Sequence, residues 1–187
     1  MASKQKKLSK QVWAETLVAA FSVEEWDMYG AEGWQPFPCT TDFASLERIY
    51  AVLPAVFPPL YEYLVLSYRW PVVELLGLRL LANPPGPGLE GLLAEIRRDK
   101  GLWEALTSEG YIQFARPGTG DYDPICFDTR RRQKDRDCPI VQIDHEEILC
   151  NGRIRVVAEL AESFRELIDR IFLKTTGQQS VSEVYGA

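Results

Sequence analysis

The stretch YIQFARPGTGDYDPICFDTRRRQKDRDCPIVQID, residues 111–144, decides the fold class of this chain. Apolar side chains alternate with their neighbours at Ile112 and Phe114 and again at Ile125 and Phe127, and this period of two favours strands over helices. The glycine-containing turn GTGD separates the first two runs, and a long charged segment precedes the third run, PIVQID. The stretch therefore predicts three short strands joined by two connections.

Helical patterns dominate the sequence before this stretch. Apolar residues recur at helical spacing and predict four helices, over about 10–21, 43–53, 59–68 and 89–106. Asp42 can cap the second helix, because its side chain can accept hydrogen bonds from the first turn. Pro58 and Pro59 suit the start of the third. Gly101 lies inside the fourth pattern and could divide it.

Irregular and extended segments separate and follow these helices. Residues 26–39 predict an irregular connection, with Trp34 and Phe37 as buried anchors. Residues 72–82 are rich in β-branched and aliphatic side chains and predict two short strands around a turn at Gly77. A last strand is expected at 153–158, after the Asn-Gly turn at 151–152.

A capping box predicts the start of the last helix. Ser163 and Glu166 have the required spacing, and the helix that they open has an apolar face made by Phe164, Leu167, Ile168, Ile171 and Phe172. The order of the elements predicts an α+β fold with N-terminal helices, a central and mostly antiparallel sheet, and a closing C-terminal helix. We expect one domain over 11–174, between a flexible basic tail, 1–10, and a flexible polar tail, 175–187.

The composition fits a globular domain and argues against a general nucleic-acid binder. Of the 187 residues, 46% are hydrophobic, which is enough for a sizeable core. The net charge of −6 and the pI near 5.0 are unfavourable for phosphate contacts, which need clustered Lys and Arg. No apolar segment follows the first lysines, and no run reaches about 18 apolar residues, so we expect neither a secretory signal nor a membrane span. The expected compartment is the cytoplasm.

The cysteines fit a reducing compartment. Cys39, Cys126, Cys138 and Cys150 include no C-x-x-C pair, which removes the usual zinc and thioredoxin spacings. The favoured interpretation is four reduced and mostly buried thiols. Cys126 and Cys138 could also face each other across the predicted hairpin, which leaves a disulfide open as the alternative.

Four segments in a fixed order resemble the SUKH superfamily of Smi/Knr-like domains. They are LERIYAVLPAVFPPLYEYL (46–64), YIQFARPGTGDYDPICFDTR (111–130), PIVQIDHEE (139–147) and ESFRELIDRIF (162–172). The resemblance implies a mixed α+β domain with a central sheet flanked by helices. It also implies a role in protein binding, because bacterial members include immunity proteins that neutralise toxins and fungal members regulate cell-wall synthesis. Residues 1–41 and the long 129–138 loop depart from the pattern.

Carboxylates and the single histidine form the only candidate site for chemistry. They are Asp121, Asp123, Asp128, Asp144, His145, Glu146 and Glu147. Such a set could ligate a cation or supply an acid–base pair. Aspartates at turns and strand ends also serve local hydrogen bonding, which is the favoured interpretation. A third possibility is an acidic surface that binds a partner.

The charged segment TRRRQKDRD, 129–137, is the one basic cluster within the predicted domain. Its arginines could contact an anion or a nucleic acid, since guanidinium groups match phosphate geometry. No aromatic residue interleaves the run to stack on bases. We therefore favour a solvated hairpin tip, where charge also suppresses edge pairing.

The sequence predicts a protein that binds another protein and uses no catalytic residue, metal or cofactor. The leading hypothesis is a SUKH-type immunity protein whose acidic face attracts a basic toxin domain. The expected contact residues are Asp121, Tyr122, Asp123, Asp128, Asp144, His145 and Glu146. One alternative is a regulatory scaffold of cell-wall or stress signalling that uses both tails, and another is a metal-dependent enzyme that uses the Asp/His cluster. Neither a nucleic-acid partner nor a membrane partner is expected.

Overall fold

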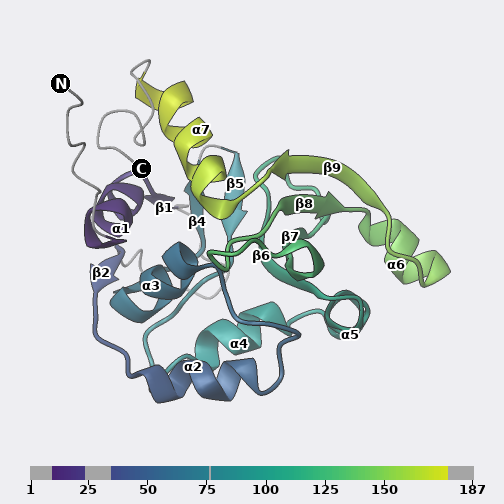
Figure 1. Cartoon of the computed structure of the whole chain (residues 1–187), viewed down its shortest axis with the longest axis horizontal. Helices are drawn as coiled ribbons and strands as arrows, with labels where there is room; N and C mark the ends of the chain where they lie inside the picture. The colour runs from purple at the N-terminus through teal and green to yellow at the C-terminus, as the bar shows by residue number, and fades with distance from the viewer. Residues whose placement is uncertain (1–9, 24–34, 76, 177–187) are drawn as a thin grey trace.

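A seven-stranded antiparallel sheet forms the centre of the structure, a computed structural model that describes residues 10–23, 35–75 and 77–176 (Figure 1). The strand order is β1-β4-β5-β6-β7-β8-β9, and β2 pairs separately with β3. The elements are α1 (Lys10–Ala19), β1 (Ser22–Val23), β2 (Phe37–Pro38), α2 (Phe43–Tyr50), α3 (Pro59–Ser67), β3 (Tyr68–Arg69), β4 (Val73–Leu75), β5 (Leu78–Leu80), α4 (Glu90–Ile96), α5 (Lys100–Ser108), β6 (Tyr111–Pro117), β7 (Ile125–Asp128), the 3₁₀ turn η1 (Thr129–Arg131), β8 (Ile140–Ile143), α6 (His145–Asn151), β9 (Val156–Ala161) and α7 (Phe164–Thr176). The predicted α+β fold is confirmed.

The three strands predicted from residues 111–144 are β6, β7 and β8. β6 pairs with β7 in a register that places Ile112 opposite Phe127, and β7 pairs with β8 so that Ile125 lies opposite Gln142. From β4 onward each strand pairs with the next strand in the sequence, so the sheet is built from local connections.

Helices cover both faces of this sheet. Phe114 and Phe127 belong to the larger core cluster, with buried residues of α1, α2, α3, α4 and α7. Cys126 and Val141 point to the opposite face, where they pack with residues of α5 and with Ile148 of α6. The central strands are therefore apolar on both sides.

An aromatic cluster joins three of the four segments on which the SUKH resemblance rests. The Tyr61 ring of α3 contacts Phe57, Phe114, Phe127 and Phe164, with ring centroids 5.1 to 5.8 Å apart in edge-to-face arrangements. Phe114 of β6 stacks on Phe127 of β7 at 4.2 Å. Helix α3, the central strands and the closing helix thus share one core.

Several local sequence signals fold as predicted. Asp42 caps α2 by accepting the Ser45 N–H at 3.0 Å. Gly77 adopts a φ of +86° between β4 and β5, a conformation that glycine reaches without a steric cost. At the start of α7 the hydroxyl of Ser163 accepts the Glu166 N–H at 3.0 Å, and the Glu166 carboxylate accepts the N–H of residue 162 at 2.7 Å.

The predicted fourth helix is two helices, α4 and α5, and Gly101 does not cause the break. Asp99 does, because its side chain accepts the Leu102 N–H at 3.1 Å and thereby caps a new helix that begins at Lys100. Gly101 lies inside the first turn of that helix.

Helix α6 replaces the predicted turn at 151–152, and the strand predicted at 153–158 is therefore displaced to Val156–Ala161. Asp144 caps α6 by accepting the Glu147 N–H at 2.9 Å. Gly152, with a φ of +63°, ends the helix in a left-handed conformation. An Asp followed three residues later by Glu has the spacing of a helix start, and this signal overrides the reading of 144–147 as a strand end.

Two further predictions about burial need correction. Phe37 is 40% exposed in β2 and is not a buried anchor, whereas its predicted companion Trp34 lies outside the described residues. Cys126 and Cys138 are buried, but Cys39 is half-buried and Cys150 is exposed. The alternative of a Cys126–Cys138 disulfide does not form, because the two thiols pack in core clusters on opposite faces of the sheet.

The expected tails lie almost wholly outside the described residues. The side chains of Ile171 and Phe172 are also outside what the structure describes. Among the helices of 10–23, 35–75 and 77–176, none combines the length and the apolar character needed to cross a membrane.

Candidate functional site

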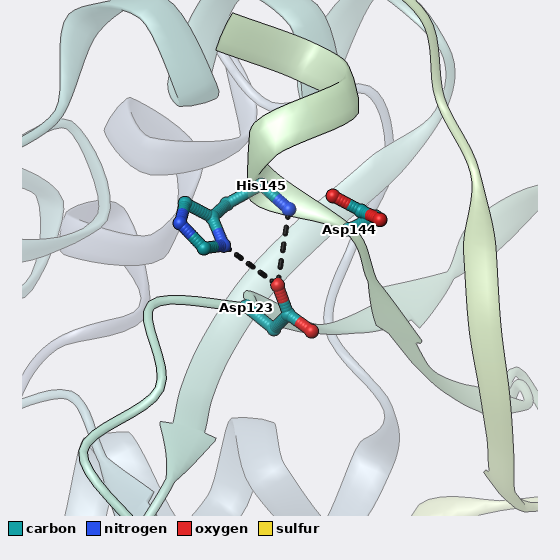
Figure 2. Close-up of side chains that lie close together, drawn as sticks. All are labelled: Asp123, Asp144 and His145. Carbon is teal, nitrogen blue, oxygen red and sulfur yellow. Dashed lines mark hydrogen bonds and ion pairs between the residues drawn. The ribbon is translucent and has the colours of Figure 1, made fainter.

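Asp123, Asp144 and His145 meet where the turn before β7 approaches the first turn of α6 (Figure 2). One oxygen of Asp123 accepts the backbone N–H of His145 at 3.1 Å and lies 2.7 Å from the imidazole Nδ1. The other oxygen accepts the side-chain N–H of Gln142 at 2.9 Å. Burial acts to raise the pKa of Asp123, but these hydrogen bonds outweigh it and hold the pKa below its ordinary value. The ionised carboxylate is therefore the acceptor, and Nδ1 of His145 is the donor in this hydrogen bond.

Asp144 faces the same junction but has its own partners. It accepts the Glu147 N–H at the start of α6 and forms an ion pair with Arg155. The backbone hydrogen bond, followed by the guanidinium, lowers the pKa of Asp144. Asp144 is thus a helix cap whose charge Arg155 balances.

The three residues could also hold a cation, since each offers one ligand atom and these atoms lie within 4.8 Å of one another. Two carboxylate oxygens and an imidazole nitrogen suit a borderline divalent metal. The hydrogen bonds described above compete with this use, and the second ring nitrogen of His145 points away from both carboxylates (Figure 2). A cation would have to displace Nδ1 from Asp123 and Arg155 from Asp144. The geometry is better explained as a tether that joins the turn before β7 to α6.

Tyr122 is the most exposed large residue of the region, with 62% of its surface accessible. Its ring lies 6.0 Å from the His145 ring and 5.3 Å from the guanidinium carbon of Arg116, so two neighbours hold it in place. Leu149 lies one turn beyond His145 on the same side of α6 and is 55% exposed. The exposed Tyr122 and Leu149 and the half-buried His145 therefore form a row from the turn before β7 to α6.

Exposed carboxylates flank this row. Asp121 is exposed and accepts the Thr119 hydroxyl at 3.0 Å, and Glu146 is exposed in the first turn of α6. We name the Tyr122 surface after its central residue and define it by the following set: Asp121, Tyr122, Asp123, His145, Glu146 and Leu149. Asp144 lies beneath it and Glu147 is half-buried.

Asp128 does not join this surface, although the sequence prediction grouped it there. It lies at the opposite end of β7 from Asp123 and is 1% exposed. Its two oxygens accept hydrogen bonds from Arg130 and Arg131, with Nε–O distances of 2.9 Å. Burial acts to raise the pKa of Asp128, but the two guanidinium groups outweigh it and lower the pKa. Asp128 is therefore the buried centre of a structural clamp.

The basic segment 129–137 is partly exposed to solvent and also makes contacts with other parts of the domain. Arg132 donates to the carbonyl of residue 56, and Arg136 pairs with Glu62 of α3 at 3.5 Å. Asp137 is buried and accepts the N–H groups of Cys138 and Phe164, both at 2.9 Å, which ties the segment to α7. The prediction of a solvated hairpin tip therefore describes only part of this segment.

Sequence reasoning missed Gln142, Arg155 and Leu149. Gln142 reaches Asp123 because the register of β7 and β8 places it opposite Ile125, beside the end of the turn. Recognition of Asp144 as a helix cap would have placed His145 and Leu149 on one side of a helix. No local signal indicates the pairing of Arg155 with Asp144.

Comparison of the chain with protein-family models, with curated proteins and with solved structures finds no match in any of the three. The family resemblance therefore rests on the four sequence segments alone.

Proposed function

We propose that this chain is a non-enzymatic protein-binding domain, and specifically a SUKH-type immunity protein that neutralises a toxin domain in the cytoplasm by binding it through the Tyr122 surface. The observation that carries the proposal is that Tyr122 and Leu149 are exposed beside the half-buried His145, in a region that also has exposed carboxylates. Aromatic anchors surrounded by polar groups are typical of the few residues that dominate binding energy at protein interfaces.

Side chains of the Tyr122 surface are already in contact with their neighbours, which favours binding. Tyr122 contacts the His145 ring and the Arg116 guanidinium, and His145 is fixed by two hydrogen bonds to Asp123. A side chain that is already held loses less conformational entropy when a partner covers it.

The charge of the surface favours a basic partner. Asp121 and Glu146 are exposed carboxylates on either side of the row, and the whole chain carries a net charge of −6. Complementary charge accelerates encounter and makes the association rate fall as salt is added. A basic toxin domain fits this requirement.

The SUKH resemblance supports the same function from an independent direction. Its four segments contribute α2 and α3, the hairpin of β6 and β7, strand β8, and α7, and aromatic residues from three of these segments meet around Tyr61. The alternative of a regulatory scaffold depends on tails that lie outside the described residues, and it predicts several weak partners in place of one tight partner.

The test uses the full chain and the C-terminal toxin domain encoded by the neighbouring gene. Co-expression of the two is expected to restore growth, and the purified proteins are expected to elute as one complex whose association rate falls with added salt. The Asp121→Lys variant should associate more slowly than the wild type, because it reverses an exposed charge on the Tyr122 surface. Absence of both a complex and protection would overturn the proposal.

A further inference from the structure

A cavity of about 280 Å³ is lined by Tyr122, but not by His145, and by residues of β5, β6 and the end of α4. Three arginines, Arg79, Arg98 and Arg116, line it, and Tyr122 stands at its rim. The remaining wall includes aliphatic side chains of β5. A cavity of this size is at the lower end of the range for small-molecule sites, which is roughly 300–1,000 Å³.

Two of the arginines oppose each other directly. The register of β5 and β6 places Arg79 opposite Arg116, and like charges at such positions destabilise a sheet. The Nε atom of Arg116 is also buried and has no hydrogen-bond partner among the described residues. Buried polar groups are nearly always hydrogen-bonded, so an unpartnered guanidinium nitrogen beside a cavity requires an explanation.

Carboxylates also lie near these arginines, and the register of β4 and β5 places Glu74 opposite Arg79. Glu95 is the one half-buried carboxylate in the lining, and it forms an ion pair with Arg98. Asp121 is exposed in the lining, and the charge of Asp99 acts to raise the pKa of Arg116. The lining thus contains three guanidinium groups and two carboxylates. Burial lowers the pKa of Arg116, and the charge of Asp99 only partly offsets this effect.

We propose that this cavity binds a small molecule through an oxyanion, either a phosphate or a carboxylate group, held by Arg116 and flanked by Arg79 and Arg98. An oxyanion would bond to the buried Nε of Arg116 and match the planar geometry of its guanidinium. The Tyr122 ring and the aliphatic wall of β5 would pack against the body of the ligand. Asp121 and Tyr122 belong both to the Tyr122 surface and to the lining of this cavity, but the inference does not rest on the proposed protein partner, because it is tested with small molecules alone.

The test titrates the purified full chain with phenyl phosphate, benzoate and benzamide, which share a ring and differ in charge and oxyanion. Binding is followed by amide chemical shifts over residues 115–122 in ¹H–¹⁵N NMR spectra. We expect a saturable shift with at least one oxyanion, at an affinity about tenfold or more above that for neutral benzamide. Saturation by phenyl phosphate alone identifies a phosphate site, and saturation by benzoate alone identifies a carboxylate site.

Two variants locate the site. Arg116→Gln should weaken binding of the oxyanion by about tenfold or more. The matched control is Arg97→Gln, which removes the same charge from an exposed side chain that stacks on Trp103 outside the cavity, and it should bind like the wild type. Should Arg116→Gln fail to fold, Arg79→Gln takes its place. Failure of both oxyanions to saturate, equal binding of benzamide, or unchanged affinity in the Arg116 variant would overturn the proposal.

Discussion

Replacement of Asp128 by Asn should destabilise the fold, because this residue is the buried centre of a clamp. Its oxygens accept hydrogen bonds from Arg130 Nε and Arg131 Nε, both at 2.9 Å, and a further bond from Arg130 Nη2 at 3.1 Å. Asn would keep the volume, but it would remove the charge and turn an N–H group toward a guanidinium. Hydrogen bonds to charged groups contribute about 1.5–3 kcal/mol each, whereas exposed ion pairs contribute about 0.2–1 kcal/mol.

The free energy that the clamp contributes should lie between these two values, because Asp128 is 1% exposed while the arginine side chains are 49% and 44% exposed. We therefore expect Asp128→Asn to lower the free energy of unfolding by about 2 kcal/mol, which corresponds to a Tm lower by about 4–8 °C in a chain of this size. Urea titration of the two proteins measures the difference. The matched control is Asp121→Asn at an exposed position, for which we expect a change below about 0.5 kcal/mol.

The pH dependence of the stability difference between wild type and Asp128→Asn tests whether the clamp stabilises the fold through charge. The clamp holds the folded-state pKa of Asp128 below its ordinary value of 3.8, so its stabilisation is fully present above that pH and is lost as pH falls through the folded-state pKa. Wild type and Asp128→Asn should therefore converge in stability under acid conditions. Equal midpoints at neutral pH, or a difference that persists unchanged in acid, would refute this reasoning.

Two other predictions concern the cysteines and the last helix. Burial raises the pKa of the Cys138 thiol to about 12 and that of Cys126 well above its ordinary value. Peptide mass spectrometry should therefore show that iodoacetamide labels the exposed Cys150 rapidly, and Cys126 and Cys138 only after unfolding. Fast labelling of Cys126 in the folded protein would contradict the packing. Ser163→Ala removes the acceptor of the Glu166 N–H and should lower stability by about 1 kcal/mol in urea titration, while an unchanged midpoint would mean that the cap is not needed.

Signals that depend on neighbours in the sequence predicted the fold well. The alternation at 111–144, the cap at Asp42, the turn at Gly77 and the capping box at Ser163 each act within a few residues, and each forms as expected. The missed helix α6 also had a local signal, in the spacing of Asp144 and Glu147, but that signal was assigned to the end of a strand.

The candidate site was less predictable, because it depends on register and on contacts between distant segments. Asp123 and Asp128 are close in sequence, yet β7 carries them to opposite ends of a strand. Arg79 and Arg116 are far apart in sequence, and only the pairing of β5 with β6 brings them face to face. Sequence patterns indicate which face of a strand is apolar, but they do not specify which charged residues meet across it.

The proposed function expects a toxin domain encoded beside the gene of this chain. The affinity of the chain for such a domain, measured by calorimetry for three proteins, tests the central claim most directly. The claim predicts that Tyr122→Ala raises Kd by about 30-fold or more, as removal of a dominant interface residue does. Phe43→Ala is the matched control, since Phe43 is a 56% exposed aromatic in α2, far from α6 (Figure 1), and its Kd should stay within about twofold of the wild type. A Tyr122→Ala protein that binds as tightly as the wild type would contradict the assignment of the Tyr122 surface.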